Sequence, residues 1–334
     1  MFGERFEIEI REQPAVWDRI AQSDRPLRLA RAIDGRDVVL VGSGSSLFTA
    51  QLGAMALRRR RVRAHALAAT EATQDYAAYR DAMVIACSQS GESADVLRAL
   101  DVLQPSTVVA LTNSPASTLG TLASLTIDVA AGAERAVPAS KSVSATTAVL
   151  LCAAAALDSP AASCADELRA TAALVARWLE DPGVSALRNA ASRIATQRSV
   201  VVLGTGYGLP VALEAALKLK EASYIHAEGF AAGEFRHGSA AILDASCAVV
   251  GIVEDRSREV VEQPLRAAAE AGSECYTIGR NIDGIVALGP SSNGTFAPLA
   301  WLVAAQLLAL EAGRARNVDS DAPRGLSKIV LNRT

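Results

Sequence analysis

The segment 212–244, ALEAALKLKEASYIHAEGFAAGEFRHGSAAILD, holds the densest group of proton-exchanging side chains in the chain. Carboxylates, a lysine and two of the chain's three histidines occur there together: Glu214, Lys218, Glu221, His226, Glu228, Glu234 and His237. An amphipathic helix needs no such concentration of groups that hold, donate and accept protons. This composition predicts an acid–base site.

The surrounding sequence predicts an α/β fold that positions this site. Residues 38–46, VVLVGSGSS, indicate a strand and a tight turn, and helical spacing follows; residues 82–103 repeat the pattern, and residues 200–208, VVVLGTGYG, start it again. Apolar strands without alternation, separated by helices, are typical of parallel sheets covered on both faces. We therefore expect two similar αβα domains, at 1–160 and 161–316, and a C-terminal tail, 317–334, that closes the active site.

Two serine-rich turns follow strands of the first half, GSGSS at 42–46 and SQSGES at 88–93. No lysine follows GSGSS as in a Walker A loop, and the third glycine of a dinucleotide fingerprint would fall at Leu47. A simple helix cap and a phosphate site both fit GSGSS alone. Two such turns favour a phosphate monoester, because a cap needs one hydroxyl and a phosphate needs several donors.

Composition limits the class of protein. The 334 residues carry a net charge of −3, which gives no electrostatic reason to expect nucleic acid. Five scattered cysteines without a CxxC pair indicate thiols of a reducing cytoplasm and no structural zinc site. The longest apolar run, 143–157, is shorter than the ~20 residues of a membrane span. We expect a cytoplasmic enzyme without metal, cofactor or membrane partner.

Four motifs in order, GSGSS, SQSGES, EAALKLKEASYIHAEGFAAGEFRHG and DAPRGLSK, resemble the sugar isomerase (SIS) family. Within it they are similar to the isomerase half of glucosamine-6-phosphate synthase, from about Ile10 to Lys328. The resemblance implies two tandem SIS domains of flavodoxin-like topology, a homodimer, and a sugar-phosphate substrate.

The resemblance also implies roles for individual residues. Glu221 is the base that moves a proton between C1 and C2, His237 opens the sugar ring and reaches a neighbouring subunit's site, and Lys328 meets the sugar carbonyl. The remaining implied positions bind or support the substrate: Ser45, Ser46, Ser88, Gln89, Ser90, Ser93, Val137, Glu214, Lys218, Arg324 and Ser327.

The residue types agree with these roles. A pocket glutamate with a matched pKa can serve two adjacent carbons, and histidine exchanges protons near neutral pH. A lysine beside a carbonyl can form a Schiff base if desolvation lowers its pKa.

The sequence has no N-terminal cysteine of a glutaminase domain, since position 2 is Phe2. We therefore expect a stand-alone glucosamine-6-phosphate deaminase that yields fructose 6-phosphate and ammonia. The alternatives are a fructosamine-type 6-phosphate deglycase, an aminotransferase that uses free ammonia, and a non-catalytic sugar-phosphate sensor.

Three departures from the family pattern bear on substrate preference. Ser239 replaces the proline after His237–Gly238, Ser327 replaces a small residue before Lys328, and the loop 137–141 reads VPASK where the family has VASTK.

Overall fold

The computed structural model describes residues 2–33, 35–74, 79–180 and 183–328. It contains two compact units, each built around one five-stranded parallel sheet. The first sheet belongs to a unit formed by residues 15–134, 141–170 and 327–334, and the second to a unit formed by residues 1–14, 135–140 and 171–326. The sequence-based prediction of two α/β halves with parallel sheets is confirmed, and the N-terminal residues 1–14 cluster with the second sheet.

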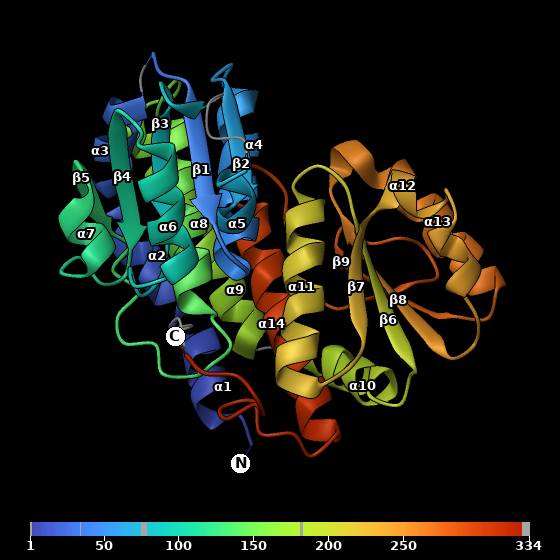
Figure 1. Ribbon diagram of the computed structural model, residues 1–334. Helices are drawn as coiled ribbons and strands as arrows, with labels where there is room; N and C mark the ends of the chain where they lie inside the picture. The colour runs from blue at the N-terminus through green and yellow to red at the C-terminus, as the bar shows by residue number, and fades with distance from the viewer. Residues whose placement is uncertain (1, 34, 75–78, 181–182, 329–334) are drawn as a thin grey trace. The chain divides into compact units, whose positions relative to one another are not determined.

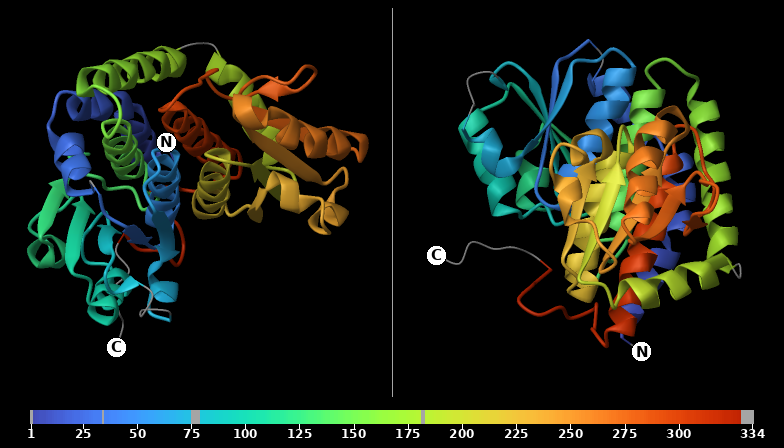
Figure 2. Two further views of the ribbon diagram at one scale, coloured as in Figure 1. Left: turned by 90° about the horizontal axis from the view of Figure 1, so that it is seen from above. Right: turned by 90° about the vertical axis from the view of Figure 1, so that its right-hand side faces the viewer.

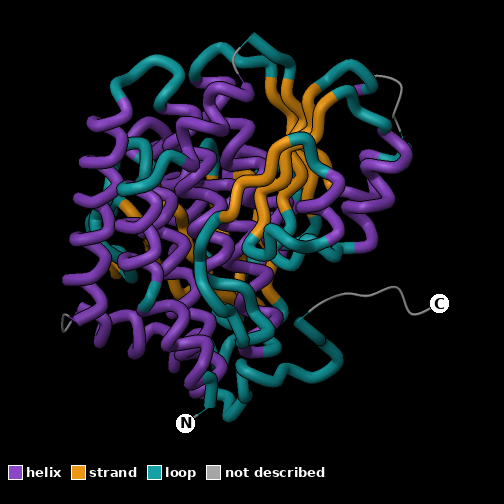
Figure 3. The backbone as a smooth tube through the Cα atoms, turned by 90° about the vertical axis from the view of Figure 1, so that its left-hand side faces the viewer, coloured by secondary structure: helices purple, strands orange, loops and turns teal. Residues whose placement is uncertain are grey.

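The first sheet contains strands β1 (Val38–Gly42), β2 (Ala64–Ala68), β3 (Met83–Cys87), β4 (Thr107–Thr112) and β5 (Leu125–Asp128). Their order is β2-β1-β3-β4-β5, and all neighbouring pairs are parallel. Figure 3 draws the strands in orange and the helices in purple. Every residue of β1 and β3 is buried, as expected for strands covered on both faces. This order is the flavodoxin-like one, with its switch point between β1 and β3.

Helices cover both faces of this sheet (Figure 1). Helices α3 (Arg25–Ile33), α4 (Ser45–Arg59) and α8 (Lys141–Ala155) pack together on one face. The other face carries α5 (Ala69–Ala72), α6 (Ala94–Leu103) and α7 (Thr118–Leu122), joined to the strands by one apolar cluster. All residues of α8 are buried, so the apolar run that begins at Val143 forms a core helix of this unit.

The second sheet repeats this plan. Its strands are β6 (Ser199–Gly204), β7 (Ala227–Ala231), β8 (Cys247–Val253), β9 (Glu274–Gly279) and β10 (Val286–Ala287), in the order β10-β9-β8-β6-β7. Counted within its own half, this order is the same as that of the first sheet. The repetition explains why VVVLGTGYG echoes VVLVGSGSS: each segment forms the first strand of its sheet in chain order and the turn after it.

Helices again lie on both faces of the second sheet (Figure 2). Helices α10 (Gly183–Ile194), α11 (Gly208–Ser223) and α14 (Ala297–Ala315) pack together on one face, and α1 (Glu4–Arg11) packs against α14. Helices α12 (Ala232–Phe235) and α13 (Arg258–Glu270) cover the other face. Two further helices, α2 (Gln13–Ala21) and α9 (Ala161–Glu180), each contain a point where the two units divide.

Among the described residues, no helix combines the length and apolarity that a bilayer crossing requires.

Candidate functional site

The acidic and basic side chains of α11 form a buried cluster. Glu214, Lys218 and Glu221 lie four and three residues apart, a spacing that places all three on one face of the helix. The Lys218 ammonium lies 3.4 Å from a Glu214 carboxylate oxygen and contacts the Glu221 carboxylate directly. The side chains of Glu214 and Lys218 are 0% and 1% exposed, whereas that of Glu221 is 21% exposed. The only part of the cluster that a ligand can reach is therefore Glu221.

The environment keeps Lys218 charged. Burial by itself would lower the pKa of Lys218, but the carboxylates of Glu214 and Glu221 outweigh burial and raise it. A permanent ammonium between two carboxylates fixes the position of the Glu221 side chain and compensates its charge. The cluster can thus present one oriented carboxylate to a reacting atom, as general base catalysis requires.

The C-terminal end of α11 contacts Ser320 and Arg324 of the tail. Helix α11 ends at Ser223, and its C-cap residue, Tyr224, has a left-handed backbone with φ 55°. The Tyr224 hydroxyl accepts a hydrogen bond from the Arg324 backbone N–H at 2.6 Å, and the Arg324 guanidinium lies 4.5 Å from the centre of the Tyr224 ring. The Ser320 hydroxyl donates to the Ala222 carbonyl at 3.2 Å. Arg324 is therefore tied to the helix that carries Glu221.

The turn after β3 contains the SQSGES residues. Ser88 is 5% exposed, and its Oγ accepts a hydrogen bond from the Gly91 N–H at 3.1 Å. The Ser90 Oγ accepts one from the Glu92 N–H at 3.2 Å, and the Gln89 carbonyl accepts one from the Thr112 hydroxyl. These bonds use the serine hydroxyls as acceptors, so each serine proton can still be donated to an anion.

The N-terminus of α6 has no hydrogen bond with the side chain of its N-cap residue. Ser93 occupies the N-cap position, but its side chain makes no cap hydrogen bond. Glu92 does not support α6 either, because its carboxylate accepts from both the N–H and the hydroxyl of Thr118 at 2.8 Å. These bonds lower the pKa of Glu92. Glu92 is thereby directed to α7 and not to the first turn of α6.

The GSGSS turn lies beside this turn in the same unit. Ser45 and Ser46 are the first two residues of α4 and are half-buried. Gly42 lets the Ser46 backbone approach the end of β1 closely, since a Cβ at position 42 would lie 2.6 Å from that backbone. Strands β1 and β3 are parallel neighbours, so both turns lie at the carboxyl edge of the sheet. The structure therefore brings the two predicted serine groups to one edge.

The C-terminal lysine binds a carboxylate that the sequence did not single out. Lys328 Nζ lies 2.9 Å from an oxygen of Glu134, which is fully buried. The Glu134 carboxylate also accepts hydrogen bonds from the N–H and the hydroxyl of Ser142, at 3.0 and 2.7 Å. Burial alone would raise the pKa of Glu134, but Lys328 and Ser142 outweigh it and lower the pKa. The pair is a charged anchor within the first unit.

The loop that follows Glu134 carries Val137, which is half-buried. The Glu9 carboxylate of α1 accepts hydrogen bonds from the backbone N–H groups of Arg135 and Ala136. Ser327, beside Lys328, is exposed.

Both histidines of the segment 212–244 are exposed. His237 lies in the turn between α12 and a short 3₁₀ helix, Ser239–Ile242, and its backbone N–H donates to the Glu234 carbonyl at 2.9 Å. Gly238 has φ 123°, and Ser239 begins the 3₁₀ helix where the family pattern has proline. In the described part of the chain, no hydrogen bond or ion pair involves the His237 imidazole. Its ring is therefore available to a ligand or to another subunit.

The structure thus gathers the predicted residues in two groups. One group lies in the first unit: Ser45, Ser46, Ser88, Gln89, Ser90, Ser93, Ser327 and Lys328. The other lies in the second: Val137, Glu214, Lys218, Glu221, His237 and Arg324. Sequence reasoning missed Glu134 and Tyr224. Glu134 could have been indicated by its position just before the loop 137–141 of the family pattern. Tyr224 could have been indicated by its aromatic ring three positions after Glu221.

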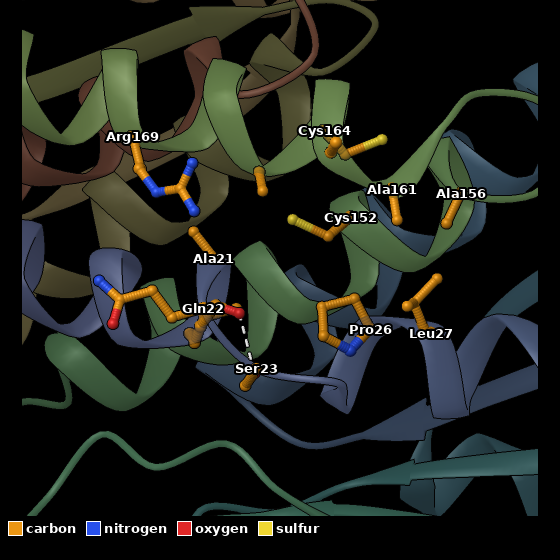
Figure 4. Close-up of a pocket in the computed structure, with 13 residues that line it drawn as sticks. Ala21, Gln22, Ser23, Pro26, Leu27, Cys152, Ala156, Ala161, Cys164 and Arg169 are labelled. Atoms are coloured by element: carbon orange, nitrogen blue, oxygen red, sulfur yellow. Dashed lines mark hydrogen bonds between the residues drawn. The ribbon is translucent and has the colours of Figure 1, made fainter.

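A pocket of about 350 Å³ in the first unit, whose lining is drawn in Figure 4, is formed by none of the predicted residues. Its walls come from α2, α3, α8, α9 and their connecting residues. Cys152 and Cys164 line it, and burial raises the pKa of both thiols. None of the predicted site residues lines this pocket, so we do not include it in the candidate site.

Comparison with known proteins supports the resemblance to the sugar isomerase (SIS) family. The SIS domain family matches residues 33–156 and 193–288. A glutamine–fructose-6-phosphate aminotransferase (isomerizing) of Pyrobaculum aerophilum is 32% identical over 96% of this chain and 56% of its own length. The chain thus spans about half the length of the curated relatives it matches.

Two solved structures share the fold. The C-terminal domain of glucosamine-fructose-6-phosphate aminotransferase from Francisella tularensis superposes with a TM-score of 0.83 at 24% identity, covering 95% of this chain and 98% of that domain. Glucosamine-6-phosphate deaminase from Thermotoga maritima gives 0.82 at 21% identity, covering 98% and 99%. At these identities the structures compare the fold alone. Together with the family match and the relative at 32% identity, they show that the chain belongs to the SIS domain family, related to the isomerase domain of glutamine–fructose-6-phosphate aminotransferase.

Proposed function

We propose that this chain is an isomerising glucosamine-6-phosphate deaminase, which converts glucosamine 6-phosphate and water to fructose 6-phosphate and ammonia. The observation that carries the proposal is the α11 cluster, in which buried Lys218 orients the one partly exposed carboxylate, Glu221. Pure phosphate binding needs no such oriented base. A shift of a carbonyl along a sugar chain does.

The proposed chemistry starts with the ring. His237 donates a proton to the ring oxygen and opens the sugar to a C1 aldehyde. Glu221 then removes the C2 proton while O1 gains a proton, which gives a C1–C2 enolamine. The Glu221 carboxyl proton can exchange with solvent before it is delivered to C1, and loss of a proton from the amine nitrogen leaves a C2 imine. Water adds to this imine, the C2–N bond breaks, and ammonia leaves. The product is the C2 ketone of fructose 6-phosphate.

Binding is assigned to the remaining residues. The hydroxyls of the two serine turns, Ser45, Ser46, Ser88, Ser90 and Ser93, together with Gln89, hold the phosphate and the adjacent sugar atoms. Val137 and Ser327 border the sugar, and Lys328 meets its carbonyl. Glu214 and Lys218 support Glu221, and Arg324 holds the tail.

Deamination is the direction that these groups complete with water alone. Amination of fructose 6-phosphate needs a supply of neutral ammonia, of which little exists at pH 7. A second candidate is nevertheless the ammonia-dependent synthesis of glucosamine 6-phosphate, because the curated relatives at about one-third identity are named isomerising aminotransferases of fructose 6-phosphate. The same base would serve both directions.

A substrate panel tests the function. Glucosamine 6-phosphate should give ammonia and fructose 6-phosphate in equal amounts. Product only from fructose 6-phosphate with added ammonium would favour synthesis, and product only from fructosyl-amino-acid phosphates would favour a deglycase. Binding of sugar phosphates without any product would indicate a sensor and contradict the proposal.

We further propose a cytoplasmic homodimer in which His237 serves the partner subunit's site, since its exposed imidazole makes no hydrogen bond or ion pair within the described residues. Mixing the inactive variants His237→Ala and Glu221→Gln tests this sharing. If half of the dimers are mixed and each restores one of two sites, about a quarter of wild-type activity returns. No recovery in demonstrably mixed dimers would contradict the shared site.

A further inference from the structure

The strongest unassigned feature is the contact between Glu134 and Lys328, residues that are 194 positions apart in the chain. The Glu134 side chain is 0% exposed and the Lys328 side chain is 23% exposed. The lysine thus reaches inward from the partly exposed tail, and its ammonium ends 2.9 Å from a buried carboxylate. A charge of this kind is retained in an interior only when it is paired and hydrogen-bonded.

Glu134 is itself held in place. Its carboxylate accepts from the N–H and the hydroxyl of Ser142, the second residue of α8. The next two backbone N–H groups, of Arg135 and Ala136, donate to the Glu9 carboxylate. The backbone beside Glu134 and its side chain are therefore both fixed, so the carboxylate is a preorganised acceptor for the tail lysine.

We propose that Glu134 is a positioning residue, which fixes the Lys328 amine where it can meet the substrate carbonyl. This inference rests on the function proposed above for Lys328. Loss of the carboxylate would remove the 2.9 Å contact to the Lys328 ammonium, and the fraction of Lys328 side chains poised for reaction would fall. Glu134 touches no reacting atom in this mechanism and acts through Lys328 alone.

A purely structural role for Glu134 gives different consequences. The two bonds to Ser142 also stabilise the first turn of α8, so loss of the carboxylate destabilises the fold in any background. A positioning role predicts in addition that the effect on turnover depends on Lys328. The two roles separate in a double-mutant cycle on kcat.

In that cycle, Glu134→Gln in the wild-type background should lower kcat for glucosamine 6-phosphate by roughly tenfold to a hundredfold, with KM changed by less than about threefold. In the Lys328→Met background the same substitution should change kcat by less than about twofold. Glu134→Asp, which keeps the charge on a shorter side chain, should recover part of the loss. Ser142→Ala serves as the matched control, because it weakens the α8 turn and leaves the Glu134 charge in place. Equal factors in both backgrounds would overturn the positioning role.

A second measurement needs no turnover. The chain has four lysines, Lys141, Lys218, Lys220 and Lys328, so amine acetylation followed by peptide mass spectrometry resolves each of them. Lys328 should be acetylated several times faster in Glu134→Gln than in wild type, while the exposed Lys220 reacts equally in both. Equal Lys328 rates would overturn the inference even if the enzyme proves to be a deaminase. A faster rate in a protein that releases no ammonia would support the contact and refute only the proposed function.

Discussion

Lys218 and Glu221 lie one helical turn apart on α11, and the fully buried ammonium of the first contacts the partly exposed carboxylate of the second. Glu214 approaches the same ammonium from the preceding turn at 3.4 Å. One cation thus joins a buried and an accessible carboxylate. Because the buried pair orients the accessible base in the proposed mechanism, stability and turnover are linked in this helix.

Lys218→Met should destabilise the protein strongly, because it leaves two carboxylates beside an apolar side chain. We expect a loss of about 3–5 kcal/mol in the free energy of unfolding, measured by urea denaturation at pH 7.5. Lys220→Met, an exposed neighbour on the same helix, should change it by less than about 0.5 kcal/mol. The folded-state pKa of Lys218 is raised, so its contribution is complete below the unfolded value near 10.5 and is lost only as pH rises through the folded value. The loss of unfolding free energy in Lys218→Met should therefore be the same at pH 7.5 and pH 9. A smaller loss at pH 9 would contradict this expectation.

Acid should weaken the ion pair between Glu134 and Lys328. The folded-state pKa of Glu134 is lowered, so its stabilising contribution is present above the unfolded value near 4.5 and is lost as pH falls through the folded value. Glu134→Gln lacks this contribution. The difference in unfolding free energy between wild type and variant should therefore narrow between pH 6 and pH 3, as measured by urea denaturation. A constant difference would show that the negative charge of Glu134 does not stabilise the folded state.

The serine turns should affect substrate capture more than turnover. Ser90→Ala removes a hydroxyl that can donate to the phosphate, a contact made in the ground state and transition state alike. We expect KM to rise roughly tenfold to a hundredfold with kcat nearly unchanged, since a hydrogen bond to a charged group contributes about 1.5–3 kcal/mol. Ser88→Ala should act similarly and also lose the bond from Gly91. Thr121→Ala on α7 is the control, and a fall in kcat alone for the serine variants would assign them another role.

Gly91→Ala should disrupt the same turn for a conformational reason. Gly91 has φ 67°, and a Cβ there would lie 1.9 Å from the Ser117 hydroxyl. The substitution therefore combines backbone strain with a steric clash. We expect a loss of at least about 2 kcal/mol in stability together with weaker sugar-phosphate binding, measured by denaturation and by calorimetry. Unchanged binding would show that the turn does not hold the phosphate.

Local patterns predicted a large part of this structure. The apolar runs that end in small residues predicted β1, β3, β6 and the helices after them, because the strand, the turn and the helix signal are adjacent in sequence. The spacing of Glu214, Lys218 and Glu221 likewise places them on one helical face without knowledge of the fold.

Contacts between distant residues were not predictable in this way. The Glu134–Lys328 pair and the stacking of Arg324 on Tyr224 join residues far apart in the chain, and no periodicity reports such pairs. A carboxylate placed like Glu92, just before the N-terminus of α6, commonly supports the first turn of the helix that follows it. In the structure Glu92 binds Thr118 of α7, because the fold brings a second helix N-terminus within reach.

Solvent exchange follows the hydrogen that Glu221 is proposed to move, and it tests the mechanism at its first chemical step. Wild-type protein in deuterium oxide should incorporate deuterium from the solvent into fructose 6-phosphate at C1, as detected by NMR. Glu221→Gln should abolish this incorporation while sugar-phosphate affinity changes little, and Glu228→Gln, an exposed carboxylate on β7, should leave it intact. Incorporation that persists in Glu221→Gln would refute the proposed role of Glu221, because another group would then transfer the proton.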